Sequence, residues 1–326
     1  FENIEKTGEI KVTKTTVGNI NVSGITFNLR GTSDSGRDID IPAVTDENGV
    51  AIFSEIPIGT YTIYEDEKTV PTAYLVADPQ NVTVTYAETK EVPIENKEKT
   101  GSITVHKTTE GQKNIEGIKF YLRGTSDSGR AIDIPATTDK DGIAKFDGVP
   151  IGTYMVIEDE ETVPYGYLVA DEKEVKVEYA QTIDETILNN EQTGTVKVHK
   201  KTADMTNVEG IRFILSGISD TGREIRIEAT TDKDGLAKFE GVPVGTYTIT
   251  EDGSTVPYGY LVADSKQVTV AYAQTVDTDM VNEKAPDTPN TGVTDNDSDG
   301  SKALCSVAII LAGAAIVMFS RKRKER

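Results

Sequence analysis

Three polar side chains recur at positions where the neighbouring sequence is apolar. Because a strand alternates its side chains between two faces, Lys14 shares the apolar face of Val12, and Glu65 shares that of Ile63. The same polar positions return every 93 residues. The lysines are Lys14, Lys107 and Lys200, the glutamates are Glu65, Glu158 and Glu251, and the asparagines are Asn96, Asn189 and Asn282. A second asparagine column, Asn21, Asn114 and Asn207, is typical of a turn.

These three residue types support one specific reaction when they meet in an apolar interior. Burial lowers the pKa of a lysine, and its neutral amine can attack the side-chain carbonyl of an asparagine. Burial also favours the neutral form of a glutamate, which can polarise that carbonyl and carry protons while ammonia leaves. The product is an amide crosslink. The alternative is a lysine with a buried stem and a solvated ammonium, with the glutamate as an ordinary ion-pair partner.

The elements that would position these residues are short strands in a unit repeated without gaps. Gly8, Gly101 and Gly194 open three units at the 93-residue spacing. Segments rich in Val, Ile, Thr and Tyr predict strands near 9–15, 25–30, 37–42, 50–54, 59–66, 73–77 and 81–95, the last with a break. Hairpin turns are expected at 46–49 and its copies. The pattern predicts an all-β protein built of sandwiches.

Length and composition narrow the possible functions. The 326 residues divide into small units, and 34 Lys and Arg against 54 Asp and Glu give a net charge of −20, which opposes nucleic-acid binding. The single cysteine, Cys305, excludes an intrachain disulfide, so small exported domains would need another stabilising device. His106 and His199 have Thr13 as their counterpart in the first unit, which excludes a shared histidine centre. No cofactor is expected.

The repeat resembles the Cna B-type domains of Gram-positive adhesins and the SpaA-type isopeptide-forming pilins, over residues 1–291. The motifs are Gly-x-Ile-x-Val-x-Lys14, Gly59-Thr-Tyr-x-x-x-Glu65 with a following Pro71 and Tyr74, and the terminal Asn96. The resemblance implies Ig-like or prealbumin-like β-sandwiches. It also implies crosslinks of Lys14 to Asn96, Lys107 to Asn189 and Lys200 to Asn282, with Glu65, Glu158 and Glu251 as the catalysts.

The tail has the order of a sorting signal. Thr288, Pro289, Asn290, Thr291 and Gly292 resemble the Leu-Pro-x-Thr-Gly motif, with Thr288 in place of leucine. An apolar span and a basic end follow. The resemblance implies that sortase cleaves after Thr291 and joins this residue to peptidoglycan, which would place the protein on a Gram-positive cell wall after a transient membrane stage. The alternative is a permanent single-pass anchor.

The expected organisation follows from the repeat and the tail. It is the end of a preceding repeat at 1–6, Cna B-type domains at 7–98, 99–191 and 192–284, a linker with the sortase motif at 285–302, a transmembrane segment at 303–320 and a cytoplasmic tail at 321–326.

Two other segments resemble ligand sites only weakly. Residues 295–300 imitate the start of a calcium loop, but Ser306 stands where the bidentate glutamate belongs, so no metal site is expected. The segment 31–37 recurs in all three units and predicts a strand followed by a turn, with a weak repeated ligand site as the alternative.

The leading hypothesis is a crosslinked stalk. Each bond would close a loop of about 83 residues, which the loop-entropy treatment of disulfides values at about 4.5 kcal/mol. One alternative is that the domains themselves bind host extracellular-matrix or glycan ligands. Another is a subunit of a sortase-polymerised pilus, although no Tyr-Pro-Lys motif occurs. A turnover enzyme is not expected, because the reaction happens once per domain and consumes the protein's own side chains.

Overall fold

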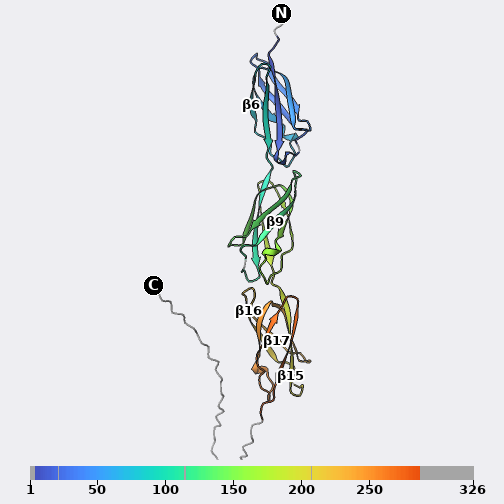
Figure 1. Cartoon of the computed structure of the whole chain (residues 1–326), viewed down its shortest axis with the longest axis vertical. Helices are drawn as coiled ribbons and strands as arrows, with labels where there is room; N and C mark the ends of the chain where they lie inside the picture. The colour runs from blue at the N-terminus through green and yellow to red at the C-terminus, as the bar shows by residue number, and fades with distance from the viewer. Residues whose placement is uncertain (1–3, 21, 114, 207, 287–326) are drawn as a thin grey trace, which may run out of the picture. The chain divides into compact units, whose positions relative to one another are not determined.

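The computed structural model describes residues 4–286 except 21, 114 and 207 (Figure 1). The expected sortase motif at 288–292, the apolar span, the basic tail and the second asparagine column therefore lie outside the described residues. Among the residues that are described, no helix is long and apolar enough to cross a membrane.

The described chain forms three successive β modules with the same order of seven strands. Module 1 holds β1 (Thr7–Thr16), β2 (Thr26–Thr32), β3 (Asp38–Val44), β4 (Val50–Pro57), β5 (Gly59–Glu65), β6 (Gln80–Val84) and β7 (Thr89–Asn96). Module 2 holds β8 (Thr100–Thr109), β9 (Lys119–Ser126), β10 (Ala131–Thr137), β11 (Ile143–Pro150), β12 (Gly152–Glu158), β13 (Lys173–Val177) and β14 (Thr182–Asn189). Module 3 holds β15 (Thr193–Thr202), β16 (Arg212–Ser219), β17 (Glu224–Thr230), β18 (Leu236–Pro243), β19 (Gly245–Glu251), β20 (Lys266–Val270) and β21 (Thr275–Asn282).

Each module is a two-sheet sandwich, as the strand pattern predicts. In module 1 the sheets have the orders β4-β1-β7 and β3-β2-β5-β6, and modules 2 and 3 repeat both orders. The first and last strands of a module are parallel neighbours, whereas the other pairs are antiparallel. The ends of the module's sequence are thereby brought side by side in one sheet.

The alternation of apolar and polar residues explains why these strands form a sandwich. In β1, Ile10 and Val12 are fully buried, while the residues between them are only partly buried. They pack with residues of the other sheet, such as Phe27 and Ile63, in one core cluster. Modules 2 and 3 have their own equivalent clusters. Each module therefore carries the apolar interior that a small domain requires.

The turn at 46–49 is confirmed, but its role as a hairpin is wrong. The Gly49 amide donates to the Asp46 carbonyl over 3.0 Å, and Gly49 has a φ of 75°. However, β3 pairs with β2 and β4 pairs with β1, in different sheets. The turn therefore carries the chain from one sheet to the other.

The strand predicted at 73–77 is also wrong, whereas the break expected in 81–95 is confirmed between β6 and β7. Tyr74 makes only an isolated bridge, to Glu98. The backbone amide of Ala77 donates to the Glu65 side chain over 2.7 Å, so it does not donate to the backbone of a neighbouring strand. Among the described residues, the segment pairs only through this one bridge, which is too short to count as a strand.

The glycine that opens each unit leaves no room for a side chain. A Cβ on Gly101 would lie 2.5 Å from the Glu178 carbonyl oxygen and 2.7 Å from that of Gln181. We expect Gly101→Ala to lower the free energy of unfolding of module 2 by about 3 kcal/mol, because backbone must move. Gly117→Ala is the control, since a Cβ there meets nothing within 4 Å and only its φ of 81° is strained; it should cost about 1 kcal/mol. Equal losses in calorimetric unfolding would contradict the steric explanation.

Candidate functional site

The parallel pairing of β1 with β7 brings the predicted lysine and asparagine together. In the ladder, Lys14 is opposite Ile94 and Thr16 is opposite Asn96. Lys14 and Asn96 are thus two residues apart along the ladder, and both side chains are buried. The third residue, Glu65, ends β5 in the facing sheet. The same elements supply the equivalent residues in modules 2 and 3.

An ion pair joins lysine and glutamate in every module. The lysine Nζ to glutamate Oε1 distances are 3.8 Å for Lys14 and Glu65, 3.6 Å for Lys107 and Glu158, and 3.5 Å for Lys200 and Glu251. All three lysine side chains are 0 % exposed, and the glutamates are at most 1 % exposed. The alternative of an ammonium group that reaches the solvent is therefore wrong.

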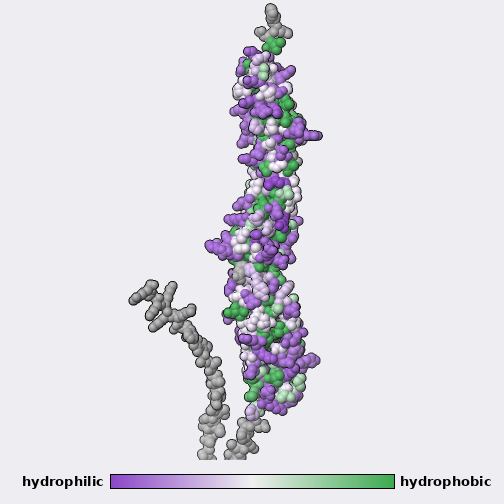
Figure 2. All heavy atoms as spheres, in the orientation of Figure 1, coloured by the Kyte–Doolittle hydropathy of each residue, from purple (hydrophilic) through white to green (hydrophobic). Residues whose placement is uncertain are grey.

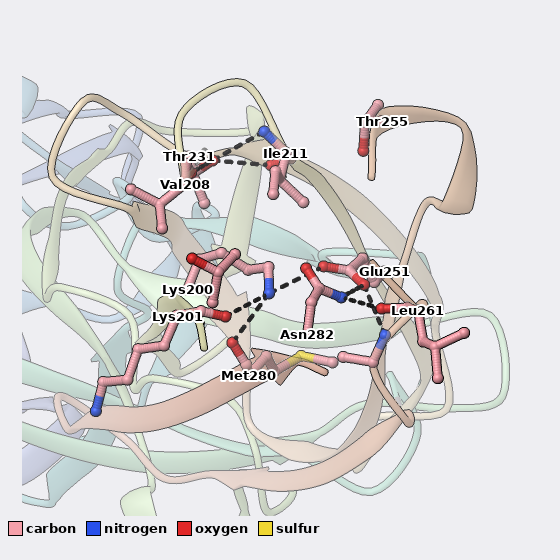
Figure 3. A network of polar contacts seen from close by, with 12 residues as sticks. Lys200, Lys201, Val208, Ile211, Thr231, Glu251, Thr255, Leu261, Met280 and Asn282 are labelled. Carbon is pink, nitrogen blue, oxygen red and sulfur yellow. Dashed lines mark hydrogen bonds and ion pairs between the residues drawn. The ribbon is translucent and has the colours of Figure 1, made fainter. Parts of the chain in front are cut away.

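The asparagine completes each cluster. In module 3 the Nδ2 of Asn282 donates to Oε2 of Glu251 over 2.6 Å and to the Leu261 carbonyl over 2.7 Å, as Figure 3 shows. In module 1 the Nδ2 of Asn96 donates to Oε2 of Glu65 over 3.0 Å. In module 2 the asparagine instead accepts, through Oδ1, a 2.5 Å hydrogen bond from Lys107, so amine and amide are in direct contact.

Backbone groups orient the charged partners. The lysine Nζ donates to the carbonyl of the next residue, at 2.6 Å in modules 1 and 2 and 2.9 Å in module 3. The glutamate Oε2 accepts from a loop amide in each module, from Ala77, Ala170 and Ala263 at 2.7 to 2.8 Å. The sequence did not reveal these contributors, because a main-chain donor carries no residue-type signal.

Several buried polar atoms of the cluster make no hydrogen bond to described residues. They are Oε1 of each of the three glutamates, Oδ1 of Asn96 and Asn282, and Nδ2 of Asn189. A buried polar atom without a partner is costly. Each of these Oε1 atoms still lies within ion-pair distance of its lysine, so within the described residues the atoms left without a polar partner are those of the asparagines.

The electrostatics of the site favour a nucleophilic amine. Burial lowers the pKa of Lys14 and of Lys107 from 10.5 to about 8, against the opposing effect of the neighbouring glutamate. Burial lowers the pKa of Lys200 in the same way. Desolvation outweighs the ion pair in each case, so the neutral amine is far more accessible near neutral pH than on an exposed lysine.

Comparisons with known proteins agree with this architecture. A family model described as SpaA, a prealbumin-like fold domain, matches residues 8–98, 101–192 and 194–284. The solved Bacillus anthracis TIE protein is 20 % identical with a TM-score of 0.61, over 85 % of this chain and 51 % of that one, so the chain spans about half the length of that structure.

Two pilin structures are more distant. BcpA, the major pilin subunit of Bacillus cereus, is 18 % identical with a TM-score of 0.41, over 86 % of this chain and all of that one. The shaft pilin SpaA from Lactobacillus rhamnosus GG is 17 % identical with a TM-score of 0.27, and the match covers 58 % of this chain and all of the pilin chain. No curated protein matches the chain.

The lowered lysine pKa predicts a pH dependence in a variant that keeps the free amine, Asn189→Ala. Between pH 8 and 10.5 the unfolded chain binds more protons than the folded one, so stability rises with pH across this window. From pH 8 to 10.5, the free energy of unfolding of module 2 in Asn189→Ala should rise by up to about 3 kcal/mol more than in Asn189→Ala/Lys107→Met, which has no amine at this position. Denaturant titrations across this range measure the difference, and a constant difference would show that Lys107 titrates as in solution.

Proposed function

The chain belongs to the SpaA family of prealbumin-like fold domains, and from that premise we propose that it is the stalk of a Gram-positive surface protein, crosslinked inside each module by a Lys–Asn isopeptide bond. The observation that carries this proposal is the burial of an amine, a carboxyl and an amide in one cluster in all three modules, with the lysine Nζ 3.5 to 3.8 Å from the glutamate in each.

The reaction balances with the groups present. Transfer of the shared proton from Lys14 to Glu65 leaves a neutral amine and a neutral acid. The lysine Nζ then attacks Cγ of Asn96, the new N–C bond forms, and the C–N bond to the amide nitrogen breaks. Glu65 relays the amine's proton to the departing nitrogen, which leaves as ammonia. Neither an oxidant nor a cofactor is consumed, and the product is an amide.

The strand order gives this bond a mechanical role. The bond would join β1 to its parallel neighbour β7, the first and last strands of the module. A pulling force that enters at β1 would cross directly to β7 and leave at the end of that strand. The strands β2 to β6 would carry none of it, so the module should not extend under load. Such behaviour suits a spacer.

The surface is compatible with a spacer as well. On the face that Figure 2 shows, hydrophobic residues are scattered among hydrophilic ones. The net charge of −20 keeps an exposed chain soluble and opposes association with anionic polymers. Attachment of the domains to host matrix or glycans remains a separate hypothesis.

Anchoring to the wall is the second part of the proposal and is supported by the sequence alone. We propose that sortase cleaves between Thr291 and Gly292 and transfers Thr291 to peptidoglycan, with residues 303–320 holding the precursor in the membrane until then.

Intact mass spectrometry of residues 1–285 tests the crosslinks. We expect the mass of the unmodified sequence less three ammonia molecules, one for each of the three modules. Glu158→Gln should restore one ammonia, because the amide cannot relay protons, while Glu160→Gln on the exposed 3-10 turn of the same module should not. An unshifted wild-type mass, with all modules folded by circular dichroism, would reject the isopeptide bonds and leave only the sandwich fold.

Cell fractionation tests the anchor. In a Gram-positive host with an active sortase, the chain should be released with the wall by muralytic digestion. Thr291→Ala should move it to the membrane fraction, whereas Thr294→Ala, beyond the cleavage point, should leave it on the wall. Wild-type chain found only in the membrane fraction would support the permanent anchor instead.

A further inference from the structure

The loop after the second strand of each module has a role that the crosslink does not explain. It contains two hydroxyl residues and an arginine at corresponding positions: Ser33, Ser35 and Arg37, then Ser126, Ser128 and Arg130, then Ser219, Thr221 and Arg223. The first hydroxyl contacts the second, as in the 2.6 Å pair of Ser126 and Ser128, and accepts from the backbone amide of the arginine. The loop is thus held in one conformation by its own side chains.

The loop binds a carboxylate in every copy. In module 2, Ser128 donates to Oε1 of Glu98 over 2.5 Å, and Arg130 donates to Oε2 over 2.7 Å. In module 3, Thr221 and Arg223 donate to the two oxygens of Glu191 in the same way. In module 1, Ser35 and Arg37 contact Glu5. A guanidinium paired with a carboxylate is among the stronger charge-assisted contacts.

The bound glutamate lies in the segment that enters the module. Glu98 and Glu191 are almost fully buried, with side chains 5 % and 0 % exposed. The same segment is hydrogen-bonded to the preceding repeat, since the Lys99 amide donates to the Ala73 carbonyl over 2.8 Å and the Leu75 amide donates to the Lys97 carbonyl over 2.9 Å. Burying a carboxylate is tolerable only with such partners.

The repeat supplies an independent observation. Glu5, Glu98 and Glu191 occupy one column, and each precedes a module with the hydroxyl and arginine loop. The next residue in this column is Lys284, and residues 285–326 contain no copy of the hydroxyl and arginine loop. Lys284 pairs instead with Asp204 at 3.5 Å, and its side chain is 64 % exposed. The glutamate is therefore present before each of the three loops, and the opposite charge stands before residues 285–326, which lack the loop.

We propose that the loop of each module is a carboxylate-binding site whose ligand is the glutamate of the entering segment, and that this contact orders the connection between successive repeats. The repeated ligand site considered for this loop is thus occupied by the chain itself. The hydroxyl and the arginine select a carboxylate, and at Glu98 and Glu191 burial excludes the water that would compete for it, whereas the Glu5 side chain is 30 % exposed.

Hydrogen exchange of residues 1–285, a unit in which every module has its own core, tests this. In Glu98→Gln the amides of Leu75 and Lys99 should exchange about tenfold faster or more, because a charged hydrogen-bonded pair is lost. Amides in the part of β9 that precedes Ser126 should keep their rates. Glu91→Gln is the matched control, since its pairing with Lys11 at 3.0 Å is exposed, and it should change neither set.

A substitution of the arginine tests the same contact in the same exchange experiment. Arg130→Gln should accelerate the same two amides, and Glu98→Gln/Arg130→Gln should be no worse than either single variant, because both remove one interaction. Unchanged exchange at Leu75 and Lys99 in the single variants would overturn the proposal. So would equal acceleration of β9, which would mean that the pair only stabilises the module. Glu191→Gln repeats the test at the more deeply buried site, read at Leu168 and Gln192.

Discussion

A lysine ammonium and a glutamate carboxylate share a buried interior in each module, and the rest of the module is organised around that pair. Removing two charges from water costs more than a single contact at 3.5 to 3.8 Å returns. Burial consequently depresses the pKa of Lys14 and Lys107 in spite of the adjacent carboxylate. A reaction that converts the amine into a neutral amide would remove the unfavourable charge, so the proposed bond relieves the cost of its own site.

The topology determines which residues can meet there. Parallel pairing of β1 and β7 places both strands' inward faces in the same layer, and the two-residue offset keeps Lys14 and Asn96 on one face. A shift of the register by one residue would turn one of them outward. Glu65 comes from the facing sheet, so the packing of the two sheets sets its distance from the amine. The site therefore exists only in the completed sandwich.

Most strands and the buried positions of the cluster could be predicted from the sequence. The alternation of apolar and polar residues, repeated every 93 residues, indicates which side chains are buried. The strands around Lys14, Glu65 and Asn96 are confirmed. The strand predicted at 73–77 is wrong because propensity says nothing about whether a neighbouring strand is available. The hairpin predicted at 46–49 is wrong because local turn chemistry does not reveal which sheet the next strand joins. Backbone donors such as the Ala77 amide could be identified only from the structure, and so could the pairing of Arg130 with Glu98.

The three copies also separate two kinds of constraint within one chain. At the lysine position a change of charge would leave the buried glutamate without its partner, so every copy must keep the pair whatever adjoins the module. The column of Glu98 depends instead on the neighbouring module, because its carboxylate is buried only against that module's loop. At the end of the last repeat, Lys284 is largely exposed, and an opposite charge there carries little cost. Variation among copies thus distinguishes the chemistry inside a module from the contacts that connect one repeat to the next.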